Sequence, residues 1–158
     1  MKSIVVYFSL DGNSELVAGF IKEALGADSL RLELERAIPR QGFAKMFHGG
    51  RQVVAHQKPA LKPYQLDLAP YELVVLGGPV WAGSPVPALL SFLERSRLSD
   101  KKVALFCCHA GGKGKALEKL RDALTGNTVV AELDLVNPAK QDAQLVRAKA
   151  VAWAKTLQ

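Results

Sequence analysis

Short, nearly unbroken apolar runs alternate along this chain with longer segments of helical periodicity. Runs such as 73–76 and 102–108 are typical of strands buried on both faces of a parallel sheet. Segments such as 13–25 carry apolar residues at i, i+3 and i+4 spacing, as an amphipathic helix does. Because this alternation implies right-handed crossovers, it predicts an α/β fold with one parallel sheet between two layers of helices. We expect strands at 3–8, 29–34, 73–76, 102–108 and 127–136, and helices at 13–25, 87–95, 113–124 and 138–157.

Length and composition restrict the class of protein further. A chain of 158 residues favours one domain over 1–158, and its 49% of hydrophobic residues excludes an intrinsically disordered protein. The only cysteines, Cys107 and Cys108, are adjacent, which excludes a disulfide scaffold; we expect both to be small buried hydrophobes on opposite faces of a strand. No run approaches the roughly 20 apolar residues of a membrane span. The apolar N-terminal stretch lacks a signal-peptide cleavage site, so a cytoplasmic protein is expected.

Three unusual loops follow the first, third and fourth predicted strands, where an open parallel sheet binds its ligands. The first, 9–14, combines hydroxyls, an amide and a glycine at a helix start, which suits either a phosphate or an ordinary capped turn. The second, 77–85, places Trp81 in a Gly/Pro-rich loop, where it either stacks on a planar ligand or caps the edge of the core. The third, 107–114, is rich in glycine and offers free N–H groups and an unhindered surface.

Several other kinds of site are excluded by spacing. The segment 114–116 lacks the hydroxyl and the upstream glycine of a mononucleotide P-loop, and no Gly-x-Gly-x-x-Gly follows the first strand. Residues 7–8 are aromatic where a receiver domain would have paired carboxylates. His48 and His56 have no cysteine or acid nearby, so no metal is expected. No Ser-His-Asp order or pair of carboxylates indicates hydrolysis, and no catalytic residue is predicted.

These loops resemble those of the flavodoxin family, and within it those of the short-chain flavodoxin-like proteins. Ser9-Leu10-Asp11-Gly12-Asn13-Ser14 is similar to the family's Thr/Ser-x-Thr-Gly-Asn-Thr phosphate loop, and 78–83 resembles its Gly-Thr-Pro-Val-Trp loop. The third loop, 110–114, resembles the glycine-rich flavin loop, and 42–63 also looks like the corresponding segment of these proteins. The resemblance implies a three-layer, doubly wound fold with a five-stranded parallel sheet of order 2-1-3-4-5.

The resemblance also implies non-covalently bound FMN, with its phosphate on the first loop and its isoalloxazine between the other two. Asp11 replaces a usual hydroxyl of the family, and we expect its side chain to point away from the phosphate and cap the following helix. His109 is the only ring in the third loop, where many flavodoxins carry a tyrosine, so that face of the flavin is expected to be more open. The backbone around Ala82 and Gly83 is expected to meet the flavin N5 region. The implied cofactor-binding residues are Ser9, Leu10, Asp11, Gly12, Asn13, Ser14, Pro79, Val80, Trp81, Ala82, Gly83, Cys108, His109, Ala110, Gly111 and Gly112.

The leading function implied by the resemblance is electron transfer between redox partner proteins. The alternative is an FMN-dependent NAD(P)H:quinone-type oxidoreductase, and the third possibility is a non-catalytic interaction module with empty loops. Flavodoxins are usually acidic, whereas this chain has a net charge of +6, all of it contributed by 36–66. The basic surplus predicts an acidic partner, steering of an anionic substrate, or a basic segment remote from the flavin edge. The six cations of the segment are too dispersed to predict nucleic-acid binding. They are Arg36, Arg40, Lys45, Arg51, Lys58 and Lys62.

Overall fold

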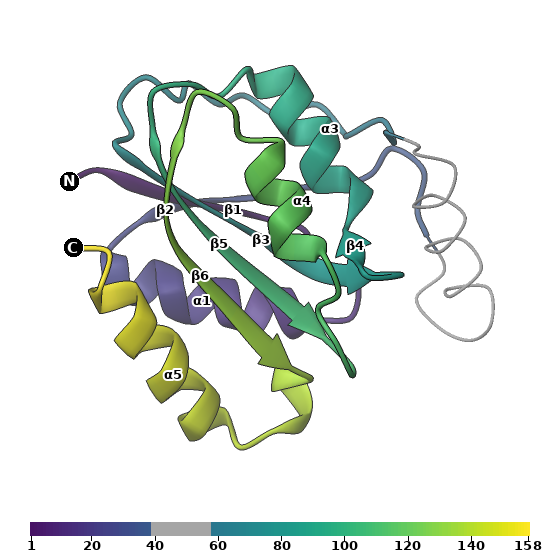
Figure 1. The fold of residues 1–158 in the computed structure, drawn as a ribbon, viewed down its shortest axis with the longest axis vertical. Coiled ribbons are helices and arrows are strands. Elements are labelled where there is room, and N and C mark those ends of the chain that lie inside the picture. The colour runs from purple at the N-terminus through teal and green to yellow at the C-terminus, as the bar shows by residue number, and fades with distance from the viewer. Residues whose placement is uncertain (39–57) are drawn as a thin grey trace.

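A computed structural model describes residues 1–38 and 58–158, and Figure 1 shows their arrangement. Its long strands form a sheet in the order β2-β1-β3-β5-β6, in which every neighbouring pair is parallel. Numbered among themselves along the chain, these strands have the predicted order 2-1-3-4-5, so the expected sheet is confirmed. They are β1 (Ser3–Tyr7), β2 (Asp28–Arg31), β3 (Leu73–Trp81), β5 (Lys102–His109) and β6 (Thr128–Val136).

In the described part of the chain, two helices cover each face of the sheet (Figure 1). On one face, α1 and α5 bury side chains such as Ile21; on the other, α3 and α4 bury side chains such as Phe92. Successive strand residues point to opposite faces, so Cys107 belongs to one core cluster and Cys108 to the other, as predicted. The three-layer architecture is therefore confirmed. The helices are α1 (Asn13–Leu25), α3 (Pro87–Ser96), α4 (Ala116–Asp122) and α5 (Ala143–Lys155).

The third strand is longer than predicted. We expected it to end near Gly77, but β3 continues to Trp81 and turns back into the short strand β4 (Ser84–Pro85), which pairs with it antiparallel. Gly77 is not at a turn; a Cβ at this position would overlap the ring of Phe106 on β5. A glycine inside a strand often marks such a close approach, and here it allows β3 to carry the second predicted loop beyond the rest of the sheet.

Other predicted elements also differ in their bounds, and the helix expected at 113–124 spans only Ala116–Asp122. The helix expected at 138–157 divides into a 3-10 turn, η1 (Pro138–Lys140), and α5. Asp142 separates them because its carboxylate caps α5, accepting hydrogen bonds from two first-turn N–H groups at 2.8 and 3.2 Å. The strand expected at 29–34 begins one residue earlier and ends at Arg31.

Some predictions fall on residues that the structure does not describe. These are the histidines His48 and His56, the cations Arg40, Lys45 and Arg51 of the basic segment, and residues 42–57 of the segment 42–63 that resembles the flavodoxin-like proteins. Within 1–38 and 58–158, no helix has the length and apolar character needed to cross a bilayer. Within the same residues, no three His, Cys, Asp or Glu side chains gather where they could hold a metal ion.

Candidate functional site

The first predicted loop joins β1 to the start of α1. Gly12 is the N-cap of α1, with a left-handed φ of 90°, and this cap makes no side-chain hydrogen bond. The Asp11 carboxylate accepts a hydrogen bond from the side chain of Asn13, the first residue of α1, at 3.4 Å, and the expected cap of the helix by Asp11 stays a prediction. The N-cap glycine has no side chain that could accept hydrogen bonds from the N–H groups of the first turn, so these groups are available to a ligand. Together with the helix dipole, they favour an anion at this position.

Two serine hydroxyls of this loop are buried, and no oxygen or nitrogen atom of the described residues pairs with either; the Ser14 hydroxyl lies beside the Cys108 thiol. Ser9 is 6% exposed and Ser14 is 1% exposed. Leaving a buried hydroxyl without a hydrogen bond costs about 1–3 kcal/mol, so such groups favour a ligand that provides the missing hydrogen-bond partner. A phosphate supplies both acceptor oxygens and negative charge, and the residues of this loop therefore fit the phosphate of FMN.

Side chains from neighbouring elements fix the position of this loop. Arg31 of β2 donates to the Ser9 carbonyl at 3.4 Å and forms an ion pair with Glu15 of α1 at 2.7 Å. The side-chain oxygen of Asn13 accepts a hydrogen bond from the Ala139 N–H at 2.9 Å. Sequence reasoning missed Arg31, because a single arginine at the end of a strand has no local signature. Its positive charge balances the acid in the first turn of α1.

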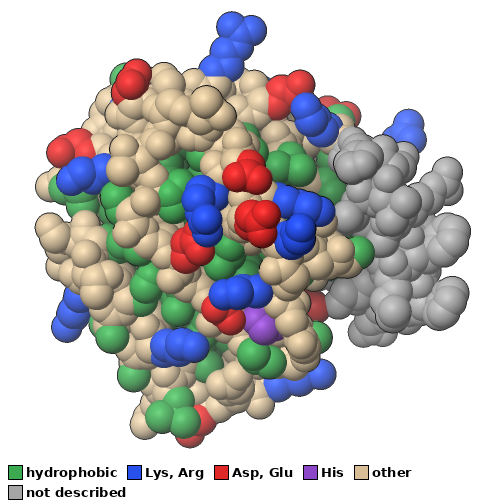
Figure 2. All heavy atoms as spheres, viewed as in Figure 1, with side chains coloured by type: hydrophobic (Ala, Val, Ile, Leu, Met, Phe, Trp, Pro, Cys, Tyr) green, Lys and Arg blue, Asp and Glu red, His purple; other side chains and the backbone are tan. Residues whose placement is uncertain are grey.

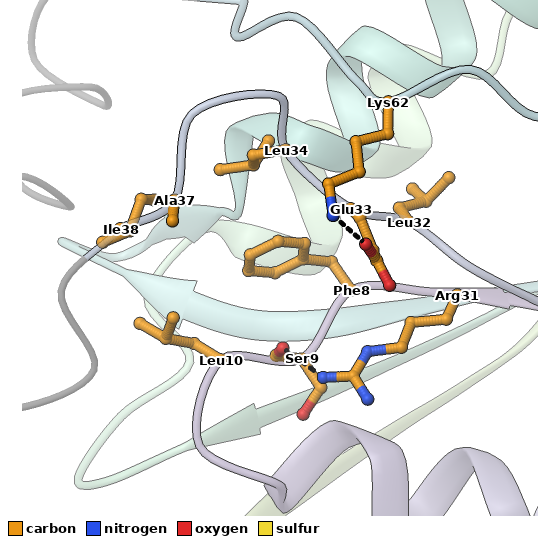
Figure 3. A pocket seen from close by; sticks show the side chains of 10 residues that line it. All are labelled: Phe8, Ser9, Leu10, Arg31, Leu32, Glu33, Leu34, Ala37, Ile38 and Lys62. Carbon is orange, nitrogen blue, oxygen red and sulfur yellow. Dashed lines mark hydrogen bonds and ion pairs between the residues drawn. The ribbon is translucent and has the colours of Figure 1, made fainter.

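A cavity of about 250 Å³ lies on the β2 side of this loop (Figure 3). Six of its ten lining residues in Figure 3 are apolar, with Phe8 at the centre of the view, and Arg31 is directed toward Ser9. At its other side, Lys62 forms an ion pair with Glu33 at 2.6 Å, which lowers the pKa of the Glu33 carboxyl. Both cations that line the cavity are thus paired with acids, and the cavity fits a phosphate less well than the loop does.

The second predicted loop is a two-residue hairpin turn between β3 and β4. Trp81 pairs with Ser84 across it, and the two residues between them, Ala82 and Gly83, have positive φ values of 47° and 67°. Two consecutive positive φ angles are typical of a type I′ turn, which matches the twist of a hairpin. The half-buried Trp81 ring packs edge-to-face on Phe8 with centroids 5.9 Å apart, so it caps the edge of the core, one of its two expected uses.

Two glycines bring the second and third loops into contact. Gly114, with φ 50°, approaches the turn so closely that a Cβ on it would lie 2.6 Å from the Gly83 Cα. The Lys115 N–H donates a hydrogen bond to the Gly83 carbonyl at 2.9 Å. The ends of β3 and β5 therefore present the two loops side by side, as a common ligand crevice requires.

The third loop begins with His109 at the end of β5. Its side chain is only 7% exposed, and its Nε2 lies 3.1 Å from Asp134 Oδ2 on β6. The His109 Nδ1 is buried and has no partner among the described residues. The ring is thus directed against β6 and does not stand over the loop, whereas the following residues Ala110, Gly111 and Gly112 are exposed.

The two cysteines do not form a reactive pair. Burial raises the pKa of both Cys107 and Cys108 to about 12, so both remain protonated thiols near neutral pH. The other predicted site residues lie within the framework of the crevice. Leu10 packs against the core, Val80 pairs with Pro85 in the hairpin, and Pro79 lies opposite Cys108 in the sheet.

Comparison with known proteins identifies the family. A family model described as NADPH-dependent FMN reductase matches residues 1–142. The chain belongs to this family. The expected membership of a flavodoxin-like, FMN-binding family is thereby confirmed, and the predicted cofactor agrees with that of the NADPH-dependent FMN reductases. No curated protein sequence matches the chain.

Solved structures share the fold of this reductase family member at low sequence identity. A putative flavoprotein from Bacteroides uniformis has a TM-score of 0.79 at 18% identity, covering 94% of this chain and 96% of that one. A flavoprotein from Lactobacillus acidophilus, crystallised in complex with FMN, has a TM-score of 0.75 at 19% identity over 84% and 92%. A short-chain flavodoxin associated with a bacterial microcompartment has a TM-score of 0.56 at 18% identity over 100% of both chains. These likenesses concern the fold.

Proposed function

We propose that this chain is a cytoplasmic FMN-dependent oxidoreductase that takes a hydride from NADPH and passes the electrons to a small acceptor of the quinone type. The loop 9–14 holds the FMN phosphate, and 79–83 and 108–112 lie on either side of the isoalloxazine. When bound, FMN would supply the hydride-accepting chemistry, and the residues of the three loops would supply its binding and orientation. The hydride brings two electrons and one proton, and solvent supplies the second proton that a quinone needs. Family membership supports this proposal.

The observation that carries the proposal is the uncovered surface of the third loop. A nicotinamide must reach within roughly 3–3.5 Å of the flavin to deliver a hydride, so one face of the ring has to be accessible. The His109 ring is 7% exposed and is held against Asp134, while Ala110, Gly111 and Gly112 are exposed. A nicotinamide therefore finds space on this side, while Trp81 is available to support the opposite side.

The first loop contributes binding energy and charge balance. The phosphate oxygens would accept hydrogen bonds from the first-turn N–H groups of α1 and from the Ser9 and Ser14 hydroxyls. Neither hydroxyl pairs with an oxygen or nitrogen atom of the described residues. Glu15 in the same turn would repel a phosphate, and its ion pair with Arg31 at 2.7 Å offsets this repulsion. The arrangement favours FMN over a flavin that lacks the phosphate.

The proposal is tested by mixing the FMN-loaded protein with NADPH in the absence of oxygen and of any other reductase. We expect rapid bleaching of the visible absorption, at a rate that saturates with NADPH. The matched variant is Ala110→Tyr, which places an aromatic ring on an exposed position of the third loop and should slow the bleaching when the variant is saturated with FMN. If NADPH leaves the absorption unchanged although dithionite bleaches it, direct hydride transfer is wrong.

The second candidate function is electron transfer between proteins, as the resemblance first implied. It is supported by the similarity of fold to a short-chain flavodoxin, which covers 100% of both chains. Among the described cations of the basic segment, Lys58 pairs with Glu94 at 3.1 Å and Lys62 pairs with Glu33 at 2.6 Å, so these two are less available to an acidic partner. A carrier would be reduced by NADPH only when a separate reductase is added, and an interaction module would not retain FMN at all.

A further inference from the structure

The carboxylate of Asp134 contacts both ends of the third loop. From the edge strand β6, its Oδ2 lies 3.1 Å from His109 Nε2, and its Oδ1 accepts a hydrogen bond from Lys113 Nζ at 3.2 Å. His109 directly precedes residues 110–112 and Lys113 directly follows them, within an exposed stretch that runs over 110–115. Each carboxylate oxygen therefore holds one end of the stretch that is proposed to flank the flavin.

Between these ends the loop has few restraints of its own. Gly111 and Gly112 have open space around them, and the Ala110 carbonyl accepts a hydrogen bond from the Asn137 side chain at 3.3 Å. Glycines lose more conformational entropy on ordering than other residues, so a loop of this composition depends on contacts at its ends. Contacts to an ionised carboxylate are stronger than those between neutral groups, so Asp134 restrains the loop together with two backbone hydrogen bonds, from the Asn137 N–H to the His109 carbonyl at 2.8 Å and from the Lys115 N–H to the Gly83 carbonyl at 2.9 Å.

Asp134 also determines where the His109 ring lies. The contact with Asp134 is the one hydrogen bond of this ring within the described residues, and Nδ1 is buried without a partner there. An ionised carboxylate only accepts hydrogen bonds, so a neutral ring beside it carries its proton on Nε2. Without that acceptor both ring nitrogens would be buried and unpaired, and the ring would be expected to leave its position for solvent beside the loop.

The surroundings of the carboxylate keep it ionised. The hydrogen bonds from His109 and from Lys113 lower the pKa of Asp134 below its ordinary value. Lys149 of α5 donates to the Asp134 carbonyl at 3.3 Å. Acidic and basic side chains interleave across this face, over α4 and β6 (Figure 2), where Glu132 pairs with Arg121 at 2.6 Å.

We propose that Asp134 is a positioning residue of the cofactor site. Its carboxylate holds the third loop at both ends and keeps the His109 ring off the face that a nicotinamide approaches. Neither Asp134 nor Lys113 belongs to the residues predicted from the sequence to bind FMN. The inference rests on the proposed function, because the loop affects affinity only if FMN binds beside it.

The test compares two substitutions on the same face of β6. Asp134→Asn keeps the shape of the side chain and removes its charge, and Glu132→Gln does the same two residues away, where the partner is Arg121 and not a loop residue. We expect Asp134→Asn to weaken FMN binding roughly tenfold, because a smaller fraction of the protein has the competent loop. Glu132→Gln should leave the dissociation constant within about twofold of wild type. Nitrogen NMR of the assigned His109 ring should show the Nε2 proton held in wild type and Glu132→Gln, and exchanging faster with solvent in Asp134→Asn, whose neutral amide oxygen is a weaker acceptor than the carboxylate.

A second variant tests the other end of the loop without disturbing a buried group. Lys113 is about half exposed, so Lys113→Gln should fold normally and weaken FMN binding by about two- to threefold. Added to Asp134→Asn, it should cause no further loss. Equal FMN affinities of Asp134→Asn and Glu132→Gln would overturn the inference, as would additive effects of Lys113→Gln and Asp134→Asn. A wild-type protein that does not bind FMN would instead overturn the proposed function.

Discussion

Replacing Gly114 by alanine should separate the second and third loops. A Cβ at this position would lie 2.6 Å from the Cα, 2.9 Å from the carbonyl oxygen and 3.1 Å from the carbonyl carbon of Gly83. All three atoms belong to the backbone, so no side chain can turn away to make room. Ordinary contact begins at 3.4 Å, and restoring it requires a displacement of about 0.8 Å, the difference between 3.4 and 2.6 Å.

The magnitude follows from three contributions. The left-handed φ of 50° costs an alanine roughly 1–2 kcal/mol relative to glycine. Forcing an extra carbon into a packed contact costs roughly 1–3 kcal/mol, and loss of the hydrogen bond from the Lys115 N–H to the Gly83 carbonyl adds about 1 kcal/mol. Gly126→Ala is the matched control, because Gly126 has a φ of 82° with nothing within 4 Å of its Cβ position. Gly114→Ala should therefore be less stable than Gly126→Ala by about 2–4 kcal/mol.

Urea unfolding of the FMN-free proteins measures this difference, and titration with FMN measures its effect on the site. We expect Gly114→Ala to bind FMN more weakly than wild type and Gly126→Ala to bind it equally well. If the two variants have the same free energy of unfolding, the close contact between the loops does not exist. The reasoning about a common crevice would then lose its geometric basis.

Three further outcomes are expected. Iodoacetamide at about pH 8 should label Cys107 and Cys108 far more slowly in the folded protein than in urea, because burial raises the pKa of both thiols to about 12 and only the thiolate reacts. Mass spectrometry follows the labelling, and rapid labelling of the folded protein would contradict the burial of the two cysteines. Arg31→Gln should weaken FMN binding roughly tenfold, because no cation then balances the negative charge of Glu15 near the phosphate. Adding Glu15→Gln should recover most of the affinity, and an unchanged dissociation constant for Arg31→Gln would argue against the charge balance. Gly83→Ala should shift the reduction potentials of bound FMN, because the turn is proposed to meet the N5 region. Spectroelectrochemistry measures these potentials, and identical values in wild type and variant would contradict the contact between the turn and N5.

The predictable part of the fold depends on local patterns. The runs that became β1, β3 and β5 are apolar on both faces, because helices cover both sides of the sheet, and this leaves a strong signal in the sequence. The helix start at Asn13 was predicted at its observed position, since polar residues precede a regular apolar periodicity there. The three loops followed from the topology once the strands were known.

The remaining features depend on contacts between segments distant in sequence. The glycine at 77 predicts the end of a strand, but β3 continues through it. The sequence does not reveal this, because the ring that fills the space beside Gly77 belongs to Phe106 on another strand. Asp134 was one polar residue in an alternating strand, a pattern that indicates only a solvent-facing side. Its relation to His109 depends on the pairing of β5 with β6, in which Asp134 lies opposite Cys107. Arg31 likewise reaches Ser9 only through the neighbouring positions of β2 and β1.

The central claim is that the chain binds FMN through its phosphate at the start of α1. It is tested most directly by titrating the purified protein with FMN and, separately, with riboflavin, using flavin fluorescence and visible absorption. We predict that FMN is retained after removal of the excess and that it binds about 10- to 100-fold more tightly than riboflavin, the contribution expected of hydrogen bonds to a charged group. Equal affinities for the two flavins, or failure to retain either, would contradict the account.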